Sequence, residues 1–151
     1  MEDLQFSPAQ EFVLASCSVD LTVKLWDLRA TQLKVQLSFR AHDCDVNVIS
    51  WNTTTKFLLA SGDDKGEFKV WDLRMLRPQD GVDQRSFEPI TRIRWHTQAI
   101  TSLQFEPGEE SVLAVSSADD KLTLWDFSVE VDEAAGADPD IPPQLMFLHQ
   151  G

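Results

Sequence analysis

The sequence predicts an all-β fold built from repeated antiparallel sheets. First, 42% of the 151 residues are hydrophobic, which is enough for a packed core. Second, a short motif that ends in Trp-Asp occurs three times along the chain. Third, segments in which apolar and polar residues alternate precede the second and third copies, as expected for strands with one buried face. We therefore expect repeated β-units over nearly the whole chain.

The Trp-Asp motif carries the strongest repeat signal. Its copies are Lys24–Asp27, Lys69–Asp72 and Thr123–Asp126, and the tryptophans lie 45 and 54 residues apart. Each copy comes after a strand of small residues and an acidic turn, which occupy residues 14–20, 59–64 and 113–119. Because several separate elements recur in the same order, the pattern indicates an internal repeat rather than a chance match.

A further strand is predicted at the start of each unit. Residues 46–51 and 100–107 alternate in polarity and reach an aromatic residue near their end, and residues 6–8 are a truncated copy of this segment. We expect residues 1–151 to form one partial domain. The predicted repeats cover residues 1–40, 41–94 and 95–144, and residues 145–151 begin a further repeat.

These motifs resemble those of the WD repeat (WD40) family, and the resemblance covers nearly the whole chain. It implies a β-propeller, in which four-stranded antiparallel blades surround a central channel. A closed propeller needs more blades than this sequence supplies, so the expected fold is a WD40 β-propeller fragment: about three blades of a larger, seven-bladed propeller. Missing blades leave unpaired strand edges, and an isolated fragment is therefore expected to associate or aggregate.

In the WD family a buried network links a histidine, a serine or threonine, an aspartate and the repeated tryptophan. In the second repeat, the resemblance assigns this network to His42, Ser61, Asp64 and Trp71. In the third repeat, it assigns the network to His96, Ser116 or Ser117, Asp119 and Trp125. Such a network satisfies buried polar groups, so we expect a structural role for these residues and not a catalytic one.

Two local features depart from the family pattern. Trp95 precedes His96 where the family usually has glycine, and the acidic turn at residues 63–66 looks one residue long. We therefore expect a looser network around these positions.

No motif in the sequence indicates enzyme chemistry, a metal or a cofactor. The sequence has no glycine-rich phosphate loop, no spacing typical of metal ligands, and no nucleophile beside a plausible base. The cysteines, Cys17 and Cys44, form neither a disulfide framework nor a zinc motif, which fits a reduced intracellular location. The apolar runs are too short to cross a membrane, and the acidic N-terminus does not resemble a secretory signal.

Negative charge is concentrated toward the C-terminal end. The net charge is −12, and residues 106–151 carry eleven acidic residues against a single basic residue, Lys121. Such a surface repels phosphate backbones, so direct nucleic-acid binding is disfavoured and basic proteins such as histones or ribosomal proteins are expected partners. The alternative is that the charge serves only solubility.

Residues 40–74 and 112–149 are similar to the glutamate-rich WD repeat proteins, and related segments occur in histone-binding WD proteins. The resemblance implies a nuclear and nucleolar scaffold and chaperone that promotes assembly of the large ribosomal subunit together with pre-ribosome assembly factors. Its expected clients are a basic large-subunit ribosomal protein and histones; an alternative is a histone-binding subunit of chromatin complexes. The acidic loop at residues 130–143 is the candidate binding site, through Glu130, Asp132, Glu133, Asp138, Asp140, Pro142 and Pro143. The other interpretation of this loop is a solvated connection between strands.

Two arginines favour a different function. Arg29 and Arg74 each stand two residues after a Trp-Asp, and this doubled motif resembles substrate receptors of cullin-4 ubiquitin ligases, in which such arginines face the adaptor subunit. The competing interpretation is that each arginine pairs with an acid of its own repeat. A third hypothesis, RNA binding through Arg85, Arg92 and Arg94, is disfavoured by Glu88 and the other acidic neighbours.

Overall fold

The computed structural model describes residues 1–29, 31–76, 87–129 and 140–151, and it consists of three four-stranded antiparallel sheets. The first sheet contains β1 (Asp3–Phe6), β2 (Val13–Cys17), β3 (Thr22–Asp27) and β4 (Lys34–Arg40). The second contains β5 (Val46–Trp51), β6 (Leu58–Asp63), β7 (Glu67–Asp72) and β8 (Thr91–Arg94). The third contains β9 (Ile100–Phe105), β10 (Val112–Ser117), β11 (Lys121–Asp126) and β12 (Leu145–Gln150). The predicted all-β fold with about three blades is confirmed.

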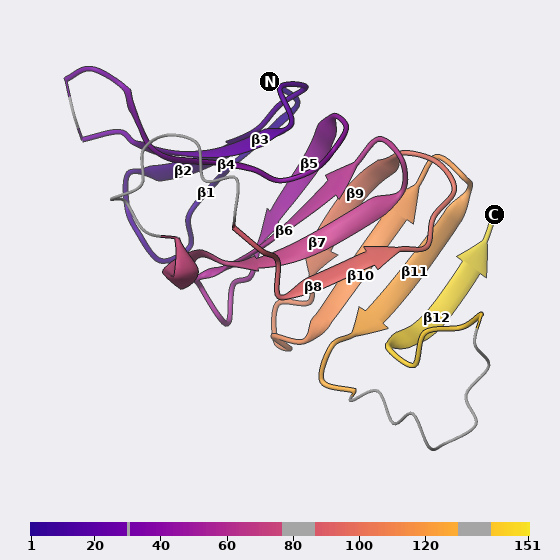
Figure 1. Cartoon of the computed structure of the whole chain (residues 1–151). Helices are drawn as coiled ribbons and strands as arrows, with labels where there is room; N and C mark the ends of the chain where they lie inside the picture. Colours follow the sequence, from indigo (N-terminus) through magenta and orange to yellow (C-terminus); the bar gives the residue numbers. More distant parts are fainter. Residues whose placement is uncertain (30, 77–86, 130–139) are drawn as a thin grey trace.

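The three sheets, which we call blades 1, 2 and 3, stand side by side in the order of the sequence (Figure 1). The first strands of the blades, β1, β5 and β9, are neighbours, and β4, β8 and β12 form the opposite edges. A short 3-10 helix, η1 (Leu73–Met75), comes directly after β7. None of the described helices has the length and apolar character that crossing a membrane requires.

The hairpin that carries the Trp-Asp motif has the same length in every blade. Each tryptophan faces a leucine of the preceding strand, in the pairs Leu14–Trp26, Leu59–Trp71 and Leu113–Trp125. A left-handed residue stands five positions before each tryptophan, namely Leu21 (φ 71°), Gly66 (φ 86°) and Asp120 (φ 60°). The prediction that the turn at residues 63–66 differs in length is therefore wrong.

The hydrophobic core lies between the blades. Trp71 of blade 2 packs on Phe39 of blade 1 with ring centroids 4.9 Å apart, and Trp125 of blade 3 packs on Phe68 of blade 2 at 5.2 Å. Both tryptophans are at most 1% exposed. Trp71 and Trp125 thus each face the preceding blade, and burial of large aromatic surface holds neighbouring blades together.

The two junctions between blades use different contacts along the first strands. At the first junction, Asp3 and Gln5 of β1 accept hydrogen bonds from the backbone N–H groups of Ile49 (3.0 Å) and Trp51 (2.6 Å) of β5. At the second junction, Gly62 leaves room for Ile100, since a Cβ atom at residue 62 would lie 2.6 Å from Ile100 Cγ2. The first junction therefore has hydrogen bonds between its first strands, whereas at the second Gly62 of β6 packs closely on Ile100 of β9 and Asn52 donates a hydrogen bond to the Glu110 carbonyl at 2.8 Å.

The last strand corrects a predicted boundary. Residues 145–151 were expected to begin a further repeat, but β12 pairs with β11, with Phe147 opposite Leu124 (Figure 1). β12 is therefore the outer strand of blade 3 and does not open a fourth sheet. The loop after Asp126 separates these two strands, and the Trp-Asp motif alone does not indicate the role of the strand beyond that loop.

Candidate interaction sites and the buried network

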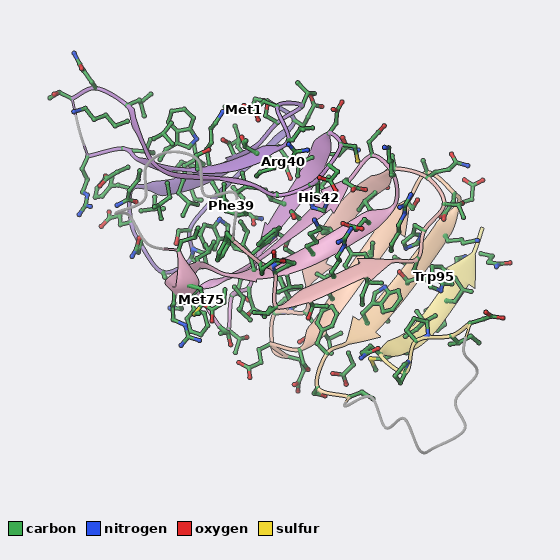
Figure 2. All side chains as sticks on the ribbon, viewed as in Figure 1. Met1, Phe39, Arg40, His42, Met75 and Trp95 are labelled. Atoms are coloured by element: carbon green, nitrogen blue, oxygen red, sulfur yellow. The ribbon has the colours of Figure 1, made fainter. Side chains whose placement is uncertain are left out.

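A chain of hydrogen bonds connects His42 to the tryptophan of blade 2. His42 lies in the connection from β4 to β5 (Figure 2). Its Nε2 is 2.7 Å from Ser61 Oγ, and its Nδ1 is 3.1 Å from Asp63 Oδ2. Trp71 Nε1 donates to the same Ser61 Oγ at 2.9 Å. Because Ser61 Oγ accepts the hydrogen bond of the indole N–H, its hydroxyl can donate to His42 Nε2, and His42 Nδ1–H then donates to Asp63.

This arrangement has the order of a nucleophile, a base and an orienting acid, yet it is closed to substrates. His42 is 1% exposed and Ser61 is fully buried. A catalytic serine needs a reacting carbon within reach of its oxygen. Ser61 Oγ instead lies inside the core, hydrogen-bonded to His42 Nε2 and Trp71 Nε1. The burial of both side chains is consistent with the structural role expected for this network.

Asp63, not Asp64, is the acid of this network. Asp63 Oδ1 also accepts the backbone N–H groups of Lys65 and Glu67, each at 2.9 Å. Asp64 is exposed, and its carboxylate accepts only a long bond from Asn47 at 3.4 Å. The predicted assignment to Asp64 is wrong because consecutive side chains at the end of β6 point to opposite sides, and only Asp63 points inward. Burial alone would raise the pKa of Asp63, but the hydrogen bonds from His42 and the backbone lower it to about 2.

Blade 3 forms the same network with its hydroxyl on a different strand. His96 Nε2 is 2.9 Å from Thr123 Oγ1, Trp125 Nε1 donates to that oxygen at 2.8 Å, and His96 Nδ1 is 3.1 Å from Asp119. The predicted roles of His96, Asp119 and Trp125 in one network agree with these contacts. The expectation of Ser116 or Ser117 as its hydroxyl is wrong.

The two serines of β10 have other partners. Ser116 Oγ lies 3.0 Å from Thr101 Oγ1, and Ser117 Oγ donates to the Gln98 carbonyl at 3.0 Å. Register explains the change, because Val115 stands where blade 2 has Ser61, and Thr123 is its cross-strand partner. The sequence did contain a signal for this hydroxyl, namely a threonine two residues before the tryptophan, Thr123-x-Trp125.

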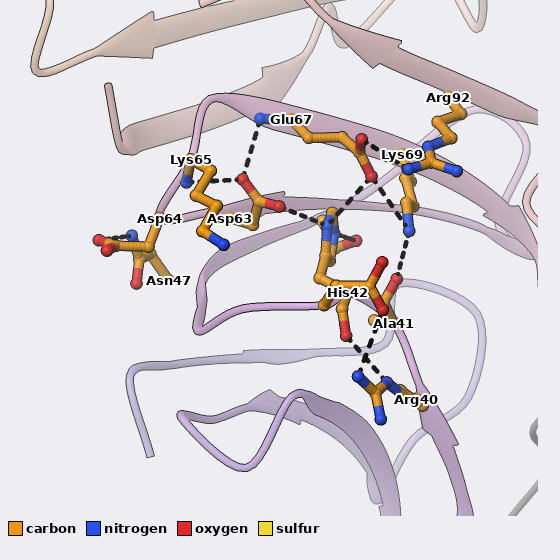
Figure 3. A network of polar contacts seen from close by, with 12 residues as sticks. Arg40, Ala41, His42, Asn47, Asp63, Asp64, Lys65, Glu67, Lys69 and Arg92 are labelled. Atoms are coloured by element: carbon orange, nitrogen blue, oxygen red, sulfur yellow. Dashed lines mark hydrogen bonds and ion pairs between the residues drawn. The ribbon is translucent and has the colours of Figure 1, made fainter. Parts of the chain in front are cut away.

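Blade 2 extends its network with charged residues that the sequence analysis did not assign to it. Glu67 lies 3.1 Å from Lys69 Nζ and 3.0 Å from Arg92 (Figure 3). Lys69 Nζ also donates to the carbonyl of Ala41 at 2.8 Å. Lys69 in blade 2 stands at the position that Thr123 occupies in blade 3. In blade 2 the residue opposite the hydroxyl of Ser61 is therefore a lysine. Two cations compensate the buried carboxylate of Glu67.

Three of these residues have the chemistry of metal ligands. Ligand atoms of His42, Asp63 and Glu67 lie within 4.8 Å of one another. However, Lys69 and Arg92 already neutralise Glu67, and His42 Nδ1 faces Asp63 at hydrogen-bond distance. A metal ion would have to displace these partners, so the arrangement fits an ion-pair network better than a metal centre.

Burial and hydrogen bonding shift the pKa values of His96, Asp119 and the two cysteines. Burial lowers the pKa of His96 despite the opposing effect of Asp119. The pKa of Asp119 is also lowered, because hydrogen bonds from Thr97 and His96 outweigh its burial. Burial raises the pKa of the Cys17 thiol to about 12 and that of Cys44 to about 11, so neither thiol ionises near neutral pH.

Arg29 and Arg74 each pair with the aspartate of their own Trp-Asp motif. Arg29 Nη2 lies 2.6 Å from Asp27, and Arg74 Nη2 lies 2.8 Å from Asp72. These contacts match the interpretation that each arginine pairs within its repeat. The side chains nevertheless remain 65% and 63% exposed. Arg74 also covers the ring of Phe57, with its guanidinium carbon 3.6 Å from the ring centroid.

The structure describes only part of the predicted acidic loop. Glu130, Asp132, Glu133 and Asp138 lie outside the described residues, as does Arg85. Asp140 and Pro143 are exposed, whereas Pro142 is half-buried and lines a groove of about 460 Å³ beside β8. Of the other arginines proposed for RNA binding, Arg92 is engaged by Glu67 and Arg94 is exposed.

The repeated hairpins, the facing tryptophans and the His–hydroxyl–Asp networks define a WD-repeat β-propeller protein. The model of the family described as "WD domain, G-beta repeat" matches residues 2–27, 33–72 and 87–126. The chain belongs to this family.

Comparison with characterised proteins adds more specific similarities. The chain is 45% identical over its whole length to "Ribosome assembly protein rrb1" of Schizosaccharomyces pombe. It is also 45% identical over its whole length to "Protein HEAT STRESS TOLERANT DWD 1" of Arabidopsis thaliana, and 30% identical over 86% of its length to "Histone-binding protein MSI1" of Saccharomyces cerevisiae. The expected similarity to ribosome-assembly and histone-binding WD proteins is confirmed. The chain spans 32%, 33% and 29% of these three relatives, about a third of each.

Proposed function

We propose that the complete protein is a non-enzymatic scaffold and chaperone in assembly of the large ribosomal subunit. In this proposal it binds a basic ribosomal protein and histones, works with pre-ribosome assembly factors, and is located in the nucleus and nucleolus. The observation that carries the proposal is the 45% identity to a ribosome assembly protein over the entire chain.

The charge distribution supports basic clients. A net charge of −12 attracts cationic proteins over several ångströms and accelerates their association. The enclosed networks around His42 and His96 support a scaffold, since in both blades the hydroxyl that faces the histidine is used to fix the tryptophan. Binding therefore has to use blade rims and loops, which is how repeat proteins generally engage partners.

The acidic loop gives a direct test. In the full-length protein, reversing the charge of Asp132, Asp138 and Asp140 together with Glu133 should reduce co-purification of large-subunit ribosomal proteins and histones from nuclear extract. A matched control reverses four exposed acids in other parts of the chain, namely Glu2, Glu11, Asp43 and Glu109. Equal capture by both variants at the same salt concentration would remove the loop from the interface.

A second candidate function is that of a cullin-4 ligase substrate receptor. Two observations favour it: the relative whose name includes DWD, and the exposure of Arg29 and Arg74 despite their ion pairs. Under this hypothesis, Arg29→Ala combined with Arg74→Ala abolishes co-purification of the ligase adaptor. A receptor role is contradicted if the double variant retains the adaptor. Capture of histones with chromatin factors, and without ribosomal proteins, would instead favour a chromatin-complex subunit.

A further inference from the structure

Each junction between blades contains a pocket at the end of the sheets that carries the Trp-Asp motifs. The first-junction pocket lies between blades 1 and 2 and has a volume of about 380 Å³. The second-junction pocket lies between blades 2 and 3 and has a volume of about 270 Å³. Met75 marks η1, the segment next to the first pocket, in Figure 2.

The two pockets are built from equivalent positions. Measured from the tryptophan of the second blade at each junction, residues at offsets −20, −15, −14, +2 and +3 line both of them. In the first pocket these positions hold Trp51, Lys56, Phe57, Leu73 and Arg74; in the second they hold Phe105, Glu110, Ser111, Phe127 and Ser128. The positions of Trp51 and Leu73 therefore remain apolar, while those of Lys56, Phe57 and Arg74 change in charge, polarity or size.

The rims differ in a way that decides what each pocket can accept. In the second pocket, Glu110 accepts a hydrogen bond across the junction from Thr55 Oγ1, so the acidic group at this rim already has a partner. In the first pocket, Lys56 and Arg74 are the only ionisable residues among the described residues of the lining, and both are exposed. Arg74 uses Nε and Nη2 to hold Asp72, which leaves its other guanidinium nitrogen for a further acceptor.

We propose that the first-junction pocket docks an extended acidic segment of a partner protein, which inserts one bulky apolar side chain between blades 1 and 2. The inserted side chain packs on Trp51 and Leu73, and flanking carboxylates pair with Lys56 and Arg74. Charge complementarity selects this occupant, because a carboxylate can pair with Lys56 and with the remaining guanidinium nitrogen of Arg74, whereas a basic segment is repelled by Lys56. The pocket is thus distinct from the acidic loop proposed to bind basic clients, and one protein can hold both kinds of partner.

The test uses the full-length protein and a fluorescein-labelled peptide, Asp-Glu-Asp-Leu-Phe-Asp-Glu-Asp, monitored by fluorescence anisotropy. The key variant combines Lys56→Glu with Arg74→Ser, which gives the first pocket the rim residues of the second. Because these residues occur at the equivalent positions of blade 3, the variant should fold, and its thermal unfolding should match the wild type. Its affinity for the peptide should fall by about tenfold or more.

Arg29→Ser is the matched control, since Arg29 pairs with Asp27 as Arg74 pairs with Asp72 but does not line the pocket. This variant should bind the peptide like the wild type. A second peptide with Gly-Ser in place of Leu-Phe should bind at least about tenfold more weakly if an apolar side chain is inserted. The proposal is overturned if the wild type does not bind the first peptide, if Arg29→Ser weakens binding as much as the double variant, or if both peptides bind equally.

Discussion

Blades 2 and 3 form the same buried hydrogen-bond network with different residues. In both, one hydroxyl oxygen accepts a hydrogen bond from the indole N–H of the repeated tryptophan. The same hydroxyl faces a histidine that is hydrogen-bonded to an aspartate. In blade 2 the hydroxyl belongs to Ser61 on the strand before the tryptophan, and in blade 3 it belongs to Thr123 on the tryptophan's own strand. In each blade the hydroxyl oxygen belongs to one of two residues that face each other across neighbouring strands, Ser61 and Lys69 or Val115 and Thr123. Either strand can therefore supply it.

The residue opposite the hydroxyl differs between the two blades as a result of this exchange. In blade 2 the residue opposite Ser61 is Lys69, which extends the network to Glu67 and Ala41. In blade 3 the residue opposite Thr123 is Val115, which is 1% exposed and belongs to the apolar core. The geometry of the network therefore constrains the fold more strongly than the identity of any one residue in it.

The largest expected effect comes from removing the shared hydroxyl. Ser61→Val leaves Trp71 Nε1 and His42 Nε2 without their partner, and Thr123→Val does the same to Trp125 and His96. Each change should lower the free energy of unfolding by about 2–4 kcal/mol, because two buried polar groups lose a hydrogen bond. Urea denaturation of the full-length protein measures this loss. Ser116→Ala serves as the control for blade 3 and should cost less than about 0.5 kcal/mol.

The next effect separates neighbouring acids in blade 2. Asp63→Ala removes the acceptor of His42 and of two backbone N–H groups, and it should cost about 2–3 kcal/mol in free energy of unfolding. Asp64→Ala should cost less than about 0.5 kcal/mol, since that side chain is exposed. The same denaturation experiment compares them. Similar losses for both variants would contradict the assignment of Asp63 to the network.

A smaller effect tests whether the hydroxyl can move between strands. Adding Val115→Ser to Thr123→Val places an oxygen in blade 3 where blade 2 has Ser61. The double variant should recover about 1–2 kcal/mol of the stability lost in the single variant, because the histidine and the indole regain a hydrogen-bond partner. No recovery would show that the strands are not interchangeable and that the common geometry is coincidental.

The smallest expected effect is a difference in pH dependence. The pKa of His96 is lowered in the folded protein, so below pH 6.5 the unfolded chain binds more protons at this residue than the folded chain does. The contribution of His96 to stability is therefore present above pH 6.5 and is lost as the pH falls toward the folded pKa. The contribution of Asp63 is present above its ordinary pKa of 3.8 and is lost only as the pH falls toward about 2.

An NMR titration of the His96 imidazole protons measures the pKa of His96 in the folded protein and so checks the first of these pH ranges. A midpoint below 6.5 is expected from the burial of the ring. A midpoint above 6.5 would mean that the pairing with Asp119 outweighs burial, and blade 3 would then gain stability on mild acidification.

The sequence was sufficient to predict the blades because their signal is periodic. The spacing of Leu14–Trp26 recurs in the other two hairpins, so the strands and turns can be derived from the repeat itself. It was not sufficient to select Asp63 over Asp64, since that choice depends on which of two adjacent side chains points inward at the end of β6. Thr123 was missed because the family pattern placed the hydroxyl on the preceding strand.

The charged extension and the pockets depend on contacts that no local motif encodes. Glu67 and Lys69 both lie on β7, and Arg92 joins them only when β8 pairs with β7. The contrast between Lys56 and Glu110 likewise gains meaning only when both are seen at the same position of successive junctions. By comparison, the pairing of Arg29 with Asp27 spans two residues and was anticipated as an alternative from the sequence.

Hydrogen exchange at the tryptophan indole nitrogens tests the central claim most directly. In the full-length protein, the Nε1–H protons of Trp71 and Trp125 should both exchange slowly, because each is buried and donates to a hydroxyl. Thr123→Val should accelerate exchange at Trp125 and leave Trp71 unchanged, whereas Ser117→Ala should affect neither. Acceleration at Trp125 by Ser117→Ala, with none from Thr123→Val, would contradict the assignment of the shared hydroxyl in blade 3.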